Sequence, residues 1–102
     1  MHSPVRYEQG RVLVDGEMTV YTCSDLKARL LAELTEHTDA TELDLSGVVE
    51  IDTAGLQLLL AARRHAGDGG RQLRVSNPSR PVLDVLELCR LNLCLAAEPG
   101  AQ

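Results

Sequence analysis

Residues 50–56, Glu50-Ile51-Asp52-Thr53-Ala54-Gly55-Leu56, decide the fold because they end a strand and begin a helix within one short turn. Three of the four residues from Val48 to Ile51 are β-branched and apolar, which is typical of a strand. The residues from Leu56 to Ala62 are almost all apolar, which predicts a largely buried helix. We expect Asp52 or Thr53 to cap this helix, since both residue types accept hydrogen bonds from its first free amides. Such a helix start is electropositive and can also dock an anion or a partner's polar group.

The chain after this turn continues to alternate between helix and strand. Residues 67–70, Gly-Asp-Gly-Gly, end the helix, and Gln72 to Val75 are predicted to form a further strand. Asn77 to Pro81 lead into a third helix, whose expected apolar stripe holds Val82, Leu86 and Cys89. Residues 93–96 are expected to form a last short strand or a packed tail, and residues 97–102 a frayed tail.

The chain before this turn begins with a predicted hairpin. Val5 to Gln9 and Arg11 to Val14 are β-type runs joined at Gly10, and Met18 to Tyr21 could form a further extended stretch. Thr22 and Asp25 have the spacing of a capping box, which predicts the start of an amphipathic helix with an apolar stripe of Leu26, Leu30, Leu31 and Leu34.

A short strand should follow that helix and complete the fold. In Glu42 to Leu45, Leu43 and Leu45 alternate with the acidic residues, which predicts a strand that stops before Ser46-Gly47. The element order is therefore β-β-α-β-α-β-α. It predicts an α/β fold with a small mixed, largely parallel β-sheet and helices packed on it. With 102 residues, we expect residues 1–102 to form a single domain.

Charge and composition exclude several classes of function. The formal net charge is −5, and two tyrosines are the only aromatic residues, so the chain has neither the basic patch nor the stacking platforms of a nucleic-acid-binding protein. No stretch approaches 18 uninterrupted apolar residues, so no membrane span is expected. The N-terminal residues lack the apolar region of a secretory signal. We therefore expect a cytoplasmic protein.

The cysteines and histidines indicate neither a metal site nor a catalytic one. Cys23, Cys89 and Cys94 form no C-x-x-C pair and are expected to be reduced thiols in the core. The three histidines are scattered, so no metal site is expected. The sequence also lacks a nucleophile elbow and the glycine-rich loops that bind phosphates, and neither catalytic residues nor a cofactor are expected.

Two runs resemble the STAS domain, the family of bacterial anti-sigma factor antagonists. They are residues 43–47, Leu-Asp-Leu-Ser-Gly, and residues 51–56, Ile-Asp-Thr-Ala-Gly-Leu. The resemblance extends back to Gly16–Val20 and forward to the strand at 73–75 and the helix at 81–91, so it covers nearly the whole chain. It implies a STAS-like domain that binds a protein partner through Asp52, Thr53, Ala54, Gly55 and Leu56.

The resemblance also bears on phosphorylation. In the phosphorylated members of the family, the acceptor is the hydroxyl residue directly before the loop glycine, and a kinase-like anti-sigma factor phosphorylates it. Ala54 occupies that position here and has no hydroxyl. No phosphoacceptor is therefore expected, with Thr53 as the candidate for a shifted one. We further expect capping of the helix to tie the Thr53 hydroxyl to backbone amides.

Three functions remain open at this point. The first is a non-catalytic interaction module, like an anti-sigma factor antagonist, that binds a kinase-like anti-sigma factor or a chemotaxis or signalling partner. The run at 19–22, Thr-Val-Tyr-Thr, resembles stand-alone members of that kind. The second is the STAS adaptor subunit of a phospholipid-asymmetry ABC transporter, which would bind its ATPase. The third is a small hydrolase that uses Asp52 and Thr53.

Overall fold

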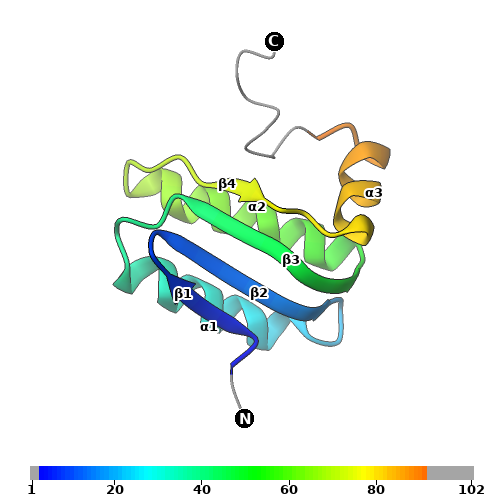
Figure 1. The fold of residues 1–102 in the computed structure, drawn as a ribbon, viewed down its shortest axis with the longest axis horizontal. Helices are drawn as coiled ribbons and strands as arrows, with labels where there is room; N and C mark the ends of the chain where they lie inside the picture. Colours follow the sequence, from blue (N-terminus) through cyan, green and yellow to red (C-terminus); the bar gives the residue numbers. More distant parts are fainter. Residues whose placement is uncertain (1–2, 92–102) are drawn as a thin grey trace.

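The computed structural model describes residues 3–91, which form a four-stranded sheet with three helices. Along the chain, the elements are β1 (Val5–Glu8), β2 (Arg11–Met18), α1 (Cys23–Glu36), β3 (Glu42–Ile51), α2 (Thr53–Asp68), β4 (Arg74–Ser76) and α3 (Arg80–Leu88). In the order β1-β2-β3-β4, the first pair is antiparallel and the other two are parallel (Figure 1). The predicted element order and the mixed, largely parallel sheet are confirmed. The predictions for 93–96 and 97–102 concern residues outside those that the structure describes.

The predicted hairpin is confirmed, and its turn residues explain it. Glu8 pairs with Arg11, which leaves Gln9 and Gly10 as a two-residue loop. Both have positive φ, 44° at Gln9 and 85° at Gly10. Such a pair of angles is typical of a type I′ turn, whose twist matches that of the flanking strands.

The segment between β2 and α1 differs from the prediction. Met18 ends β2, so the further extended stretch over Met18 to Tyr21 was wrong, and Thr19 to Thr22 form a turn instead. Thr22 is the N-cap residue of α1, but its side chain accepts no hydrogen bond from that helix. Its hydroxyl donates to the Glu17 carbonyl at 2.8 Å and accepts from the Thr19 amide at 3.0 Å. The predicted capping box was therefore wrong, because the threonine closes the preceding turn.

β3 is longer than predicted, since Ser46 and Gly47 lie inside the strand. β3 carries one extra residue opposite the Leu13–Asp15 stretch of β2, and another opposite Gly16–Glu17. Such bulges shift the side-chain alternation by one residue. This shift lets Val48 face the core together with Leu43 and Leu45.

α1 and α2 lie side by side on one face of the sheet (Figure 1). α1 buries Leu26, Leu30 and Leu34, as its spacing predicts. α2 buries its Gly55, Leu56, Leu58, Leu59, Ala62 and Ala66. Leu60 is only partly buried, so the apolar face of α2 is narrower than its sequence suggests.

The last two elements are also shifted from their predicted positions. β4 covers Arg74–Ser76 and not Gln72 to Val75. α3 packs Val82 and Leu86 inward, and the Ser79 amide donates to the Leu45 carbonyl at 3.3 Å. Cys89 lies just beyond the last residue of α3 and is exposed, so its place on the buried stripe was wrong.

Candidate functional site

The start of α2 is organised by Asp52, which directly follows β3. Its backbone is extended and its Oδ1 accepts from the Gly55 amide at 3.1 Å, the geometry of a helix N-cap. Its own amide donates to the Met18 carbonyl at 3.2 Å, which fixes the helix start to the end of β2. Asp52 is thus the residue that turns the chain from strand into helix.

The second oxygen of Asp52 reaches a different segment. Oδ2 accepts from the Val20 amide at 3.0 Å, so one carboxylate holds both the β2–α1 turn and the start of α2. The Val20 amide contributes most to lowering the pKa of Asp52 below its usual value, and the Gly55 amide adds to the effect. The carboxylate is therefore ionised at neutral pH, as this bridging role requires.

Gly55 allows α2 to approach the end of β2 more closely than any other residue would. A Cβ at this position would lie 2.2 Å from the Met18 carbonyl oxygen and 2.7 Å from Cγ1 of Ile51. A contact of 2.2 Å with a backbone oxygen cannot be relieved by rotating a side chain. Gly55 therefore sets the position of the whole site against the sheet.

The five residues of the predicted partner-binding loop differ in exposure. Thr53 is exposed, and Asp52 and Ala54 are half-buried. Gly55 and Leu56 are buried beneath them. Asp52 caps the helix, so the expectation that capping would tie up the Thr53 hydroxyl was wrong. Within residues 3–91, that hydroxyl has no hydrogen-bond partner.

Two exposed apolar residues lie in the turn that the Asp52 carboxylate joins to this loop. Val20 and Tyr21, in the β2–α1 turn, have exposed fractions of 65% and 91%. The turn that presents them is closed by Thr19 and Thr22, and the Asp52 carboxylate holds its backbone. Sequence reasoning missed both residues because it assigned them to a strand; the signal was two apolar side chains directly before the Thr22 helix start.

A groove of about 310 Å³ runs between α1 and α2 from this loop. Its lining residues include Ala54 at the loop and Lys27 and Arg64 on the two helices, with no acidic side chain among them. Cys23 also lines it, and burial together with the nearby Asp52 charge raises the pKa of the Cys23 thiol. The groove gives the loop an adjoining, positively charged surface.

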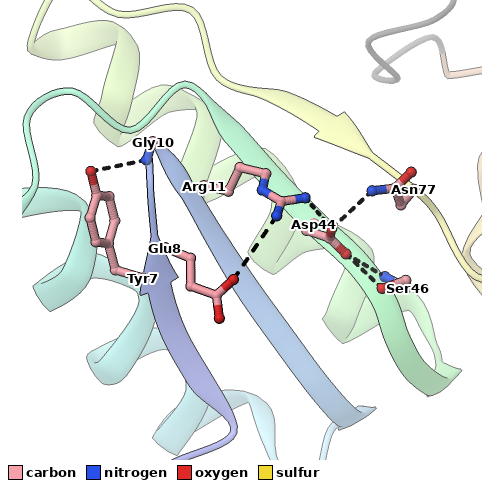
Figure 2. Close-up of polar contacts among 7 residues, drawn as sticks. All are labelled: Tyr7, Glu8, Gly10, Arg11, Asp44, Ser46 and Asn77. Carbon is pink, nitrogen blue, oxygen red and sulfur yellow. Dashed lines mark hydrogen bonds and ion pairs between the residues drawn. The ribbon is translucent and has the colours of Figure 1, made fainter.

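A second polar cluster lies on the opposite face of the sheet, around Asp44 (Figure 2). Asp44 is only 4% exposed. It accepts from the amide and hydroxyl of Ser46, from Asn77 at 2.9 Å and from Arg11 at 3.2 Å. Burial alone would raise its pKa, but the hydrogen bonds from Asn77 and Ser46 and the charge of Arg11 outweigh burial and lower it. The cluster ties β2, β3 and the segment before α3 together.

The described residues offer few other groups that could bind a metal ion or react. Among residues 3–91, no group of three histidine, cysteine or acidic side chains is arranged to hold a metal ion. Cys23 is half-buried against the core, whereas Cys89 is exposed, so the expectation of core thiols was wrong for Cys89. Cys94 lies outside the described residues. No helix in this part of the chain is long and apolar enough to cross a membrane.

Comparison with known proteins identifies the family. The family model described as "Mlab, STAS domain" matches residues 4–96. The chain belongs to the STAS family. A comparison with curated proteins finds no match.

Solved structures of anti-sigma factor antagonists share the fold. One, from Thermotoga maritima, is described as a candidate anti-sigma factor antagonist. It has a TM-score of 0.69 and 21% identity, over 85% of this chain and 77% of that one. Another is the anti-sigma factor antagonist SpoIIAA in its unphosphorylated form, with a TM-score of 0.60 and 16% identity, over 82% and 80% of the two chains. The chain is therefore a STAS domain whose fold resembles that of anti-sigma factor antagonists.

Proposed function

We propose that this STAS domain is a non-catalytic interaction module whose docking face is formed by Val20, Tyr21, Thr53 and Ala54. The face combines two exposed apolar side chains with the start of α2. Exposed apolar residues that gather beside a polar rim are typical of protein-binding surfaces. Gly55 and Leu56 support the face from below and do not touch the partner.

The observation that carries this proposal is the pair of hydrogen bonds made by Asp52. With one oxygen on the Val20 amide and the other on the Gly55 amide, the carboxylate holds the two halves of the face in one arrangement. A surface ordered before binding loses less conformational entropy when its partner docks. Asp52 therefore acts as a positioning residue.

The same hydrogen bonds argue against the hydrolase alternative. A hydroxyl nucleophile needs a base within hydrogen-bond reach. Both oxygens of Asp52 accept from backbone amides, and the Thr53 hydroxyl has no hydrogen-bond partner within residues 3–91. The Asp52 carboxylate is therefore used to hold the loop in shape and is not placed to activate the Thr53 hydroxyl.

Ala54 removes the phosphoacceptor that the resemblance places before Gly55. A phosphate there would add charge at the centre of the docking face. Ala54 has no hydroxyl, so no phosphate can add negative charge to the docking face at this position. We propose that partner binding is not switched by phosphorylation at residue 54. Thr53, one residue earlier, is the exposed hydroxyl through which a shifted switch would act.

Two kinds of partner fit the face. The fold likeness to anti-sigma factor antagonists supports a kinase-like anti-sigma factor or a related signalling protein. The description of the matching family, "Mlab, STAS domain", is the specific observation that supports the second candidate, the ATPase of a phospholipid-asymmetry ABC transporter. The kinase-like anti-sigma factor and the transporter ATPase both bind ATP, and with either partner this chain acts as a non-catalytic adaptor.

The test is capture of the partner from the native cell by the tagged full chain, followed by mass spectrometry. We expect an ATP-binding protein of one of the two kinds, and its identity decides between them. Tyr21→Asp should abolish its capture. Leu88→Asp is the matched control, because Leu88 is an exposed apolar residue on α3. Equal capture by both variants would show that binding occurs elsewhere.

A further inference from the structure

Positive charge is concentrated near the other end of α2. Residues 63–74 contain four arginines and one acidic residue, Asp68, in a chain whose formal net charge is −5. Thr53 and Arg63 are ten residues apart in α2, which places them about 15 Å apart along the helix axis. This charged region therefore lies at the far end of α2 from the docking face, and Arg64 also lines the groove that leads from that face.

Three of these arginines line a cavity of about 400 Å³ between α2 and the segment that leads into β4. Its lining residues are Leu60, Arg63, Arg64, Gly67, Arg71, Gln72 and Leu73. No acidic residue is among them, so the cavity has no internal counter-charge. Its volume lies in the range of small-molecule sites, roughly 300–1,000 Å³.

The three lining arginines do not play the same part. Arg71 is used structurally, since its guanidinium donates to the backbone carbonyls of Leu34, His37 and Ala40 at 2.7–3.1 Å. Arg63 donates only its Nε, to the Leu73 carbonyl at 3.1 Å, which leaves its two terminal nitrogens without an acceptor within residues 3–91. Arg64 makes no hydrogen bond or ion pair to any residue in that range. Two guanidinium groups beside the cavity therefore have free donors.

The carbonyls at the end of α2 do not neutralise these donors. The Ala66 carbonyl accepts from the amides of Gly69 and Arg71, and the Gly67 carbonyl accepts from Gly70. Two carbonyls in the last turn of α2 are thus occupied by the chain's own amides. The free N–H groups of Arg63 and Arg64 remain for a ligand.

We propose that this cavity binds a small phosphate-bearing ligand. Arginine forks match phosphate oxygens bidentately, and a phosphate monoester carries nearly two negative charges at neutral pH, so one group can engage both guanidiniums. Leu60, which is only partly buried, supplies an apolar surface for the organic part of the ligand. The site goes beyond the protein-docking function, and its test does not depend on that function.

The experiment titrates the ¹⁵N-labelled full chain at constant ionic strength, observed by NMR. The probes are inorganic phosphate and glycerol 3-phosphate, with sodium chloride as the blank. We expect saturable shifts that cluster on residues 60–73 with both phosphates. Tighter binding of the ester would show that the site also contacts the organic part of the ligand, and equal affinities would confine recognition to the phosphate group.

Three variants distinguish a built site from general charge attraction. Arg64→Gln should weaken phosphate binding by about tenfold or more, because it removes a charge-assisted fork. Arg80→Gln removes the same charge from the exposed start of α3 and should leave affinity nearly unchanged. Gly67→Met narrows the cavity without changing charge and should also weaken phosphate binding; a Cβ at this glycine meets no atom within 4 Å, so the new side chain starts in open space. Absence of saturable shifts, or equal weakening by Arg80→Gln, would overturn the proposal.

Discussion

Gly55→Ala tests whether the close approach of α2 to β2 positions the docking face. Helix propensity alone predicts that replacing a helical glycine by alanine stabilises the fold, by about 1 kcal/mol. The structure predicts the opposite sign, because the new Cβ would lie 2.2 Å from the Met18 carbonyl oxygen and 2.9 Å from the Met18 Cβ. Relieving this contact requires a shift of α2 away from the sheet.

The magnitude follows from known costs of overpacking. Inserting a methyl group into a closely packed site costs about 1–3 kcal/mol, and more where the backbone must move. Because the clash is with backbone, we expect a net loss of about 2 kcal/mol after the propensity gain. For a domain of this size, such a loss lowers the midpoint of thermal unfolding by about 8–16 °C.

Gly67→Ala is the matched control, since it makes the same change in the same helix. A Cβ at Gly67 meets no atom within 4 Å, so only the propensity gain applies, and we expect the variant to be more stable by about 0.5–1 kcal/mol. Urea and thermal unfolding of both variants and the parent measure the sign of the stability change in each variant. A Gly55→Ala variant as stable as the parent would refute the close approach as the constraint on α2.

The remaining predictions concern the core, the buried carboxylate and phosphorylation. Leu59→Ala should cost about 2–5 kcal/mol in urea unfolding, and Leu60→Ala distinctly less, because Leu59 is fully buried and Leu60 only partly. The pKa of Asp44 is lowered by folding, so its contribution to stability is present above the unfolded pKa of about 3.9 and is lost as pH falls through the folded value. Asp44→Asn should therefore reduce the fall in unfolding free energy between neutral and acidic pH, and an unchanged fall would contradict this. With a kinase-like partner and ATP, Ala54→Ser should gain a phosphate detectable by mass spectrometry that the parent lacks; high-occupancy phosphothreonine at Thr53 in the parent would instead indicate a shifted switch.

The parts of the fold that sequence reasoning predicted depend on contacts between near neighbours. The β1–β2 hairpin follows from two residues, Gln9 and Gly10, that adopt positive φ. The helix start at Asp52 follows from a carboxylate three residues before the amide that it accepts from. Such short-range patterns are visible in one sequence because the partners are adjacent in it.

The parts that it missed depend on partners far apart in the chain. Asp44 and Asn77 are 33 residues apart, so nothing local indicates that an acidic residue in an alternating strand is buried. The link from Asp52 to Val20 spans 32 residues, and only this link shows that the β2–α1 turn belongs to the same surface as the start of α2. Thr22 illustrates the reverse case. Its spacing from Asp25 is that of a capping box, but its hydroxyl donates to the carbonyl of Glu17, five residues earlier in the chain.

The central claim is that the start of α2, with Val20 and Tyr21, binds a protein partner. The most direct test is calorimetric titration of the captured partner into the parent, Ala54→Glu and Leu88→Glu. A carboxylate favours a helix start by about 0.3–1 kcal/mol at exposed sites, and Ala54 is only half-buried, so thermal melts should show the fold intact. We expect Ala54→Glu to weaken binding by about tenfold or more, because the partner must desolvate an unpaired charge. Leu88→Glu adds the same charge on α3 and should bind like the parent. An unchanged affinity for Ala54→Glu would contradict the assignment of this face.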